Sequence, residues 1–154
     1  MRVIAGIAKG RPLVGPAWES TRPSSDRTKE ALFGMLESLL GTPASGGGAW
    51  ESIRVLDLYA GSGALGIEAL SRGARFADFV DVDRRCQRLI QSNLERTGLA
   101  DRGRAHVADA RLFVSRLASR GAEPYGLVLM DPPYGVQLPL ALLAGLRVLA
   151  SPGT

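Results

Sequence analysis

The residues with the clearest chemical potential form a short run, Asp131-Pro132-Pro133-Tyr134, directly after an apolar stretch. The Asp131 carboxylate and the Pro132 carbonyl are two acceptors that could each take an N–H from one amine. Two prolines fix the backbone that carries these acceptors. The Tyr134 ring offers a face on which a flat base could stack. Because such a run can also be a plain turn, the prediction that it orients an amine depends on the rest of the chain.

A second run, the glycine turn (residues 61–66), follows another apolar stretch. Gly61 and Gly63 allow a tight turn and a close approach to a ligand, and Gly66 lets the next helix pack near its strand. Asp57 lies within the preceding strand, where a buried carboxylate needs a partner such as a ligand ammonium. Tyr59 ends that strand, and we include it with Asp57, Gly61 and Gly63 in a predicted cofactor site. The glycine spacing alone also fits any nucleotide-binding fold or a purely structural turn.

Further acids follow the next two predicted strands. An acid about 15–20 residues beyond such glycines, at the end of the second strand, suits a ribose diol as a two-point acceptor. Both Asp81 and Asp83 qualify, and Asp81 is preferred because Asp83 directly precedes a helix that it could cap. Asp109 and Ala110 follow the third strand, where a contact with a cofactor base and a simple helix cap remain equally open.

The elements that must position these residues alternate regularly after residue 49. We predict strands at 53–59, 77–82, 104–108 and 125–130, and helices at 64–72, 84–98, 110–120 and 138–149. This alternation predicts right-handed crossovers and a parallel sheet with helices on both faces, which is an α/β, Rossmann-like fold. Ligands bind beyond the carboxyl ends of such strands, and one edge would carry Asp57, Asp81, Asp109 and Asp131.

The first 48 residues read differently. Residues 2–7 and 11–14 predict a β-hairpin, which would be mobile unless it is docked. A helix is expected after Pro23, with Ser24 or Ser25 as its cap, and its apolar positions form one stripe: Ala31, Leu32, Met35, Leu36, Leu39 and Leu40. Residues 41–48 are rich in Gly, Ser and Pro and predict a flexible linker. We therefore divide the chain into an N-terminal arm (1–48) and a body (49–154).

Composition limits the class of protein. The 154 residues are 45% hydrophobic and 22% charged, with a net charge of +4, one cysteine and one histidine. No internal disulfide and no metal cluster are expected, and no stretch suits a membrane span or a signal peptide, so a cytoplasmic protein is expected. Residues 1–29 hold six basic and two acidic side chains, whereas residues 30–154 hold thirteen of each. The arm therefore suits a polyanion, although a solvated face explains its charge equally well.

Residues 57–66 and 131–134 together resemble the amino-group branch of the class I S-adenosylmethionine-dependent methyltransferases. The resemblance implies that fold, with S-adenosyl-L-methionine as cofactor. It places the glycine turn at the amino-acid tail, Asp57 near the ammonium, Asp81 at the ribose, and Asp109 with Ala110 at the adenine. At residues 131–134 it implies that an exocyclic base amine is held with its lone pair toward the sulfonium methyl. Such a base must be single-stranded or flipped out of its duplex.

Residues of the arm resemble a more specific family within these methyltransferases. Residues 2–6, 9–11, 21–27 and 30–33 are similar, in order and spacing, to the bacterial family that methylates guanine N2 in small-subunit (16S) ribosomal RNA. This implies that ribosomal RNA, or the assembled small subunit, is the partner of a monomeric enzyme. The implied RNA contacts are basic: Arg2, Lys9, Arg11, Arg22 and Arg27. Alternatively, Arg22 and Asp26 tie the helix of the arm to the body.

The methyltransferase fold continues past its last helix into further strands, so the body is expected to be incomplete at its C-terminus. Three alternative functions remain open. Residues 131–134 alone permit a DNA adenine or cytosine amino-methyltransferase. A nicotinamide-dependent oxidoreductase fits the glycines and Asp81 but leaves Asp57, Asp131 and the basic arm unexplained. An inactive RNA-binding fragment is favoured only by the missing strands.

Overall fold

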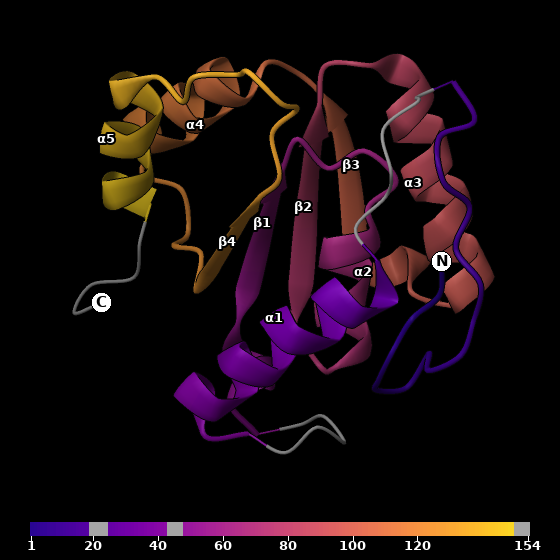
Figure 1. Ribbon diagram of the computed structural model, residues 1–154. Coiled ribbons are helices and arrows are strands. Elements are labelled where there is room, and N and C mark those ends of the chain that lie inside the picture. The colour runs from indigo at the N-terminus through magenta and orange to yellow at the C-terminus, as the bar shows by residue number, and fades with distance from the viewer. Residues whose placement is uncertain (19–24, 43–47, 150–154) are drawn as a thin grey trace.

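Four parallel strands form one sheet at the centre of the computed structural model, which describes residues 1–18, 25–42 and 48–149 (Figure 1). The strands are β1 (Arg54–Leu58), β2 (Phe76–Asp81), β3 (Gly103–Val107) and β4 (Leu127–Met130). They lie in the order β3-β2-β1-β4, so β1 pairs with both β2 and β4. All four predicted strands are confirmed, and the largest difference is at β4, which begins two residues later than expected.

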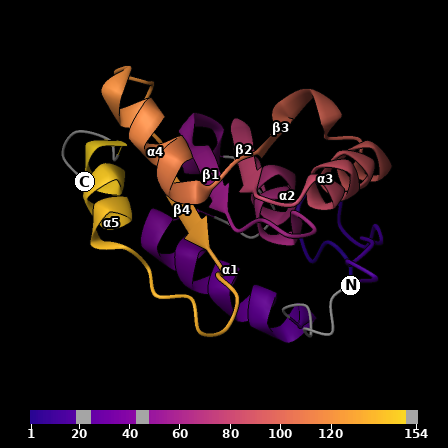
Figure 2. The ribbon, with the colours of Figure 1, turned by 90° about the horizontal axis from the view of Figure 1, so that it is seen from above.

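Five α-helices cover the two faces of this sheet. They are α1 (Asp26–Leu40), α2 (Ala64–Ser71), α3 (Arg84–Thr97), α4 (Ala110–Ser119) and α5 (Leu140–Leu149). Short 3-10 turns precede β1 (Gly48–Ser52) and β3 (Ala100–Arg102). Seen from above, α4 and α5 lie on one side of the sheet, and α1, α2 and α3 lie on the other (Figure 2).

Alternating side chains along the strands explain the two layers. Leu56 and Leu58 of β1 belong to the core beneath α4 and α5, whereas Val55 belongs to the core on the other face. Successive residues of a strand point to opposite faces, so a strand buried on both sides is apolar almost throughout. The predicted α/β, Rossmann-like fold with helices on both faces is confirmed.

The N-terminal segment, residues 1–18, is docked on the body. Hairpin-like pairing is present as a single antiparallel bridge between Arg2 and Pro12, with Val3 N donating to Arg11 O at 3.0 Å. Val3, Ala8 and Leu13 are buried in the same core cluster as Val55 of β1. The predicted hairpin is therefore present as this antiparallel pairing. Burial of the three apolar side chains docks it on the body, which was the condition under which it was expected to be ordered.

Helix α1 begins and ends as expected but turns a different face inward. Ser25 caps its first turn by accepting from Thr28 N at 3.2 Å, and Gly41 ends it in the left-handed conformation. Its buried side chains are Lys29, Phe33 and Glu37, whereas Met35 is 61% and Leu39 is 84% exposed. The predicted apolar stripe is thus wrong for its Ala31, Met35 and Leu39 half.

Buried charges explain that rotation of α1. Lys29 Nζ lies 3.5 Å from a Glu68 carboxylate oxygen, and Glu37 accepts from Arg72 Nη1 at 2.5 Å. Arg72 also donates to Glu68 at 2.9 Å, so two cations and two anions neutralise one another. Pro23, Ser24 and residues 43–47 of the predicted linker lie outside the described residues. The division of the chain at residue 48 stays a prediction.

Candidate cofactor and amine site

The glycine turn joins β1 to α2 with an unusual backbone. Tyr59, Gly61 and Gly63 have φ values of 57°, 56° and 77°, and Tyr59 is the one non-glycine residue of the described chain in this region. Side chains rarely adopt this conformation, and strain of this kind is concentrated at functional sites. A Cβ built on Gly61 meets no atom within 4 Å. Glycine at this position is thus explained by its conformation, and the space beside its backbone is open.

Asp57 is a buried carboxylate with a backbone partner. Its Oδ2 accepts from Gly66 N at 2.9 Å, and the residue is 2% exposed. A Cβ on Gly66 would lie 2.3 Å from the Phe79 ring and 3.0 Å from the Asp57 oxygen, so a side chain there would displace both. Burial, together with the nearby charges of Asp131 and Asp81, raises the pKa of Asp57 to about 8, although the Gly66 hydrogen bond opposes this.

Asp81 holds the glycine turn from the neighbouring strand. Its Oδ2 accepts from Gly61 N at 3.0 Å, and its Oδ1 accepts from Asp83 N at 2.9 Å. Asp83 caps α3 by accepting from Arg85 N at 2.8 Å, and it also pairs with the Arg85 guanidinium at 2.7 Å. Asp83 is therefore engaged as a helix cap, whereas each Asp81 oxygen keeps a lone pair for a further donor. This arrangement favours Asp81 as the acid that would face a ligand.

Asp109 serves as a helix cap. It precedes α4 and accepts from Leu112 N at 3.1 Å, while its side chain is 49% exposed. Ala110 beside it is 5% exposed. The capping alternative is thus present in the structure, and the cofactor contact of Asp109 and Ala110 stays a prediction.

The run of residues 131–134 extends from β4 at the same edge of the sheet. Met130 is paired with Leu58, so Asp131 follows β4 at the level where Tyr59 follows β1. Asp57 is paired with Leu129, so Asp131 lies two residues further along the neighbouring strand, and its charge contributes to the raised pKa of Asp57. Tyr134 is fully exposed, and Val136 N donates to Pro133 O at 3.2 Å to close the turn. The structure therefore brings Asp57, Asp81 and Asp131 to one edge.

One contributor to this edge was missed by the sequence reasoning. The buried Asn93 of α3 donates to Ser62 O in the glycine turn at 2.9 Å. Its amide also exchanges hydrogen bonds with Val14, accepting from the backbone N–H and donating to the carbonyl at 2.9 Å each. It thereby ties the N-terminal segment to the glycine turn. The available signal was a polar residue within the inward positions of an amphipathic helix, next to Ile90 and Leu94.

The predicted RNA contacts are spread over the N-terminal segment and α1. Lys9 and Arg27 are exposed, whereas Arg2 pairs with Asp26 at 3.3 Å. Arg11 donates to the Arg96 carbonyl at 3.0 Å, at the carboxyl end of α3, and Arg22 lies outside the described residues. Of the four described residues, Arg2 and Arg11 are therefore engaged in contacts within the protein, and the RNA contacts stay a prediction.

Two properties of the described chain concern membrane proteins and metal-binding proteins. None of the described helices is long and apolar enough to cross a membrane. Within the described ranges, His, Cys, Asp and Glu side chains form no group of three or more that could hold a metal ion.

Comparison of the sequence with known proteins assigns the chain to a family. The family model described as "Conserved hypothetical protein 95" matches residues 1–152. The Bacillus subtilis protein YlbH, whose name assigns it provisionally to the rRNA methyltransferases, is 43% identical over 93% of this chain and 72% of its own length. Ribosomal RNA small subunit methyltransferase D of Escherichia coli is 35% identical over 87% of this chain, which spans 60% of that protein.

Solved structures give the same result. The Escherichia coli protein yhhF, titled provisionally as a methyltransferase, matches with a TM-score of 0.74 and 31% identity, over 97% of this chain and 74% of that one. A SAM-dependent methyltransferase from Agrobacterium tumefaciens matches with a TM-score of 0.63 and 25% identity, over 81% of this chain and 42% of that one. The predicted class I methyltransferase fold is thereby confirmed. The chain belongs to the family described as conserved hypothetical protein 95, alongside proteins named ribosomal RNA small subunit methyltransferase D.

Proposed function

We propose that this protein transfers a methyl group from S-adenosyl-L-methionine to the exocyclic N2 amine of a guanine in small-subunit ribosomal RNA. The observation that carries the proposal is the meeting of Asp57, Asp81 and Asp131 at one sheet edge, around an open glycine turn. The names of the relatives support ribosomal RNA as the substrate class. The choice of guanine N2 rests on the resemblance of the N-terminal residues.

The residues at this edge fit the cofactor. S-adenosyl-L-methionine carries an ammonium, a ribose diol and, as its chemical contribution, an electrophilic methyl on a sulfonium. Asp57 is a buried carboxylate that pairs with no lysine or arginine of the described chain, so an ammonium nearby would offset its desolvation. Asp81 can accept two hydroxyls with its remaining lone pairs while it holds Gly61.

Residues 131–134 would orient the acceptor amine. Such an amine is a poor nucleophile because its lone pair is delocalised into the ring. If the Asp131 carboxylate and the Pro132 carbonyl each accept one N–H, the nitrogen is held toward tetrahedral geometry with its lone pair free to attack. The Asp131 carboxylate would also take the proton that the alkylated amine releases. This is catalysis by orientation, assisted by a positioned base.

Tyr134 would hold the target base. Its ring is fully exposed at the end of the run, so a base that has left its stack can lie against it. A guanine amine paired inside a duplex cannot reach these acceptors, so the nucleotide must be single-stranded or flipped out. The partner is therefore unpaired RNA, either naked or within the assembled small subunit.

The experiment is transfer of labelled methyl to small ribosomal subunits that lack the modification, followed by digestion to nucleosides. Labelled N2-methylguanosine is the expected product, and subunits that already carry the modification serve as the control. Label in methyladenine or methylcytosine of a DNA substrate would instead favour the DNA enzyme. Tight NAD binding without a response to S-adenosylhomocysteine would favour the oxidoreductase, and RNA binding without transfer would favour the inactive fragment.

A further inference from the structure

The N-terminal segment runs alongside α3 for most of the helix. Arg11 contacts the Arg96 carbonyl near the end of α3, Val14 is held by Asn93, and Trp18 lies over Arg85 in the first turn. Figure 1 shows this segment beside α3 on the outer side of the molecule. Residues 11–18 therefore lie along α3, and the Trp18–Arg85 contact joins them to the exposed side of that helix.

Helix α3 has the largest net positive charge of the helices in the body. Residues 84–97 contain four arginines and one glutamate, whereas the other residues of 30–154 contain nine basic and twelve acidic side chains. The even total of thirteen each hides this separation. Three of the arginines, Arg85, Arg88 and Arg96, share a stripe with Ser92 at helical spacing of three, four and four residues. All three are exposed.

Stability alone does not explain where these arginines lie. Positive charges in the first turn of a helix oppose its dipole, and α3 has Arg84 and Arg85 there with no acidic residue inside the turn. The cap residue Asp83 offsets part of this cost by pairing with Arg85 at 2.7 Å. A basic first turn held in place at some cost suits a ligand that carries negative charge.

Trp18 adds an aromatic surface to this charge. Its ring lies 4.6 Å from the Arg85 guanidinium carbon, and the residue is still 38% exposed. Arg85 is itself fixed by two contacts of its Nε and one of its Nη2 with the Asp83 carboxylate. Bases stack on aromatic rings and on guanidinium planes, so a fixed Trp–Arg pair is a platform for an unpaired base.

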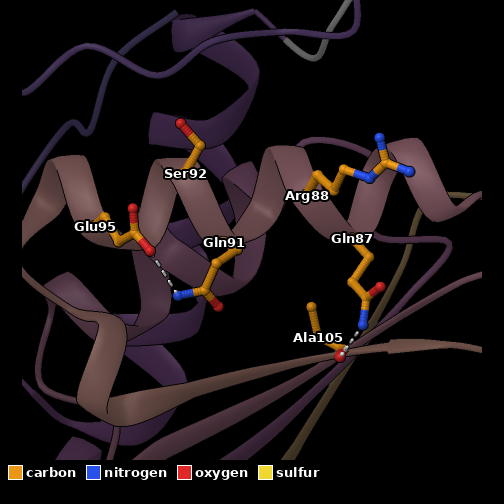
Figure 3. A pocket seen from close by; sticks show the side chains of 6 residues that line it. All are labelled: Gln87, Arg88, Gln91, Ser92, Glu95 and Ala105. Carbon is orange, nitrogen blue, oxygen red and sulfur yellow. Dashed lines mark hydrogen bonds between the residues drawn. The ribbon is translucent and has the colours of Figure 1, made fainter.

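The same helix borders a shallow pocket. It has a volume of about 340 Å³ and is lined by Gln87, Arg88, Gln91, Ser92, Glu95 and Ala105. In Figure 3, Arg88 and Ser92 lie along one flank of the helix, and Gln87 and Gln91 point toward the edge strand β3. Gln87 donates to the Ala105 carbonyl, and Gln91 donates to Glu95. Of the residues that line the pocket, Arg88 is the cationic one.

We propose that Trp18, Arg85, Arg88, Ser92 and Arg96, here called the α3 face, form a second RNA-binding surface that takes a single-stranded segment. Arg88 and Arg96 contact phosphates while one base stacks on the pair formed by Trp18 and Arg85. The α3 face adjoins the cofactor edge, since Asp83 is bonded to both Arg85 and Asp81. This inference rests on the proposed function for its partner, and it accounts for basic residues that the arm does not include.

The test measures binding of polyuridylate, a single-stranded RNA probe. Removing residues 1–20 would not be a clean test of the RNA contacts, because this segment includes the core side chains Val3, Ala8 and Leu13. Arg88→Glu is therefore compared with Arg116→Glu, which changes an exposed arginine of α4 in the same way. We expect Arg88→Glu to weaken binding and to lower the slope of log affinity against log salt by about 1 or more. Arg116→Glu should change neither.

Stacking is tested separately at Trp18. Trp18→Ala should weaken binding roughly 5- to 150-fold, the range for loss of one stacked base, and Trp18→Phe should restore most of it. Polyuridylate should also protect the accessible tryptophan from acrylamide quenching, since the other tryptophan, Trp50, is already buried. Unchanged affinity and salt slope in both Arg88→Glu and Trp18→Ala would overturn the inference. Equal competition by polyglutamate would do so as well, since it would reduce the surface to a general anion site.

Failure of this inference is distinguishable from failure of the proposed function. If wild-type protein methylates small subunits while Arg88→Glu and Trp18→Ala bind polyuridylate normally, the α3 face is rejected and the methyltransferase stands. If wild-type protein transfers no methyl but both variants lose RNA binding, the α3 face stands and the methyltransferase is rejected.

Discussion

Two carboxylates of strand β2, three residues apart, are held in opposite ways. Asp78 lies 2.8 Å from His106 Nε2 and accepts from the Tyr125 hydroxyl at 2.8 Å and from Arg54 Nη2 at 3.0 Å. Asp81, at the carboxyl edge, accepts from two backbone N–H groups, those of Gly61 and Asp83. One carboxylate is surrounded by side-chain donors, and the other keeps acceptor capacity at an accessible edge.

The pKa values of the buried acids follow the same division. Burial alone would raise the pKa of Asp78, but hydrogen bonds from His106 and Tyr125 and the charge of Arg54 hold it below its usual value. Burial raises the pKa of Asp57, and there the neighbouring acids add to the effect. Fully paired carboxylates therefore mark the parts of the molecule that hold the fold. The acids gathered at one edge mark a site whose missing positive charge a ligand would supply.

The largest effect is expected on stability, from removing the paired carboxylate of Asp78. Asp78→Ala would leave Arg54 and Tyr125 without their shared acceptor in a largely buried position. Removing one partner of a buried ion pair costs about 3–5 kcal/mol, and Arg54 keeps some solvent contact, so we expect a loss of about 3 kcal/mol in the free energy of unfolding. Urea denaturation followed by circular dichroism measures it.

The matched control for that variant is Asp81→Ala, on the same strand. Its loss of stability should be much smaller, because the backbone groups that it leaves can reach water at the edge. Equal losses of stability in Asp78→Ala and Asp81→Ala would contradict the division into a structural and a ligand-facing carboxylate.

The next effect concerns catalysis, where the edge should be sensitive and the paired cluster should not. Asp131→Ala removes one of two proposed acceptors for the target amine and leaves Asp57 and Asp81 in place. Methyl transfer to small subunits should fall about 100-fold or more, as when one oriented polar group is lost from a catalytic site. Affinity for RNA should change little, and affinity for the cofactor should not fall, because removing the Asp131 charge favours the ionised form of Asp57. Asp131→Asn keeps an acceptor oxygen and should retain more activity than Asp131→Ala, and near-normal turnover by Asp131→Ala would remove the proposed mechanism.

Sequence patterns predicted the elements that form the ligand-facing edge better than the paired clusters of buried charges. Strand and helix alternation, the glycine spacing and the helix cap at Asp83 are local features, so they could be read directly and the structure agrees with them. The paired clusters could not be predicted, because Asp78 meets partners that lie 24 to 47 residues away in the chain. Likewise, Lys29 was counted among the basic side chains of residues 1–29 that suit a polyanion, although it is fully buried against Glu68, which lies 39 residues away in the chain.

A smaller effect separates the two neighbouring acids Asp81 and Asp83. Asp81→Ala should weaken binding of S-adenosylhomocysteine by about 1–3 kcal/mol, because hydrogen bonds to the ribose diol are lost. Asp83→Ala removes a helix cap and the Arg85 contact, so it should affect stability more than cofactor binding. Isothermal titration calorimetry of both variants makes the test. If Asp83→Ala loses as much affinity as Asp81→Ala, the assignment of the ribose to Asp81 is wrong.

The smallest effect should appear as a pH dependence of cofactor binding at Asp57. With a pKa of about 8 in the free protein, its carboxyl group is largely protonated at neutral pH. An ammonium bound nearby stabilises the carboxylate, so binding should release one proton. Affinity for S-adenosylhomocysteine should then rise about tenfold between about pH 6 and 7, which corresponds to roughly 1.4 kcal/mol. Calorimetry in buffers of different ionisation enthalpy measures both the affinity and the released proton.

Asp57→Asn provides the control, because the amide can still accept from Gly66 N but cannot titrate. Its affinity should be lower and should not change over this pH range. The same group also gives an opposite trend in folding. A carboxyl whose pKa is raised from 3.8 to about 8 stabilises the folded state below pH 3.8, and this contribution is lost as the pH rises through about 8. Cofactor binding should therefore strengthen over the pH range in which the free protein loses stability, and Asp57→Asn should abolish both trends. A pH-independent affinity in the wild-type protein would show that no charge of the cofactor lies near Asp57.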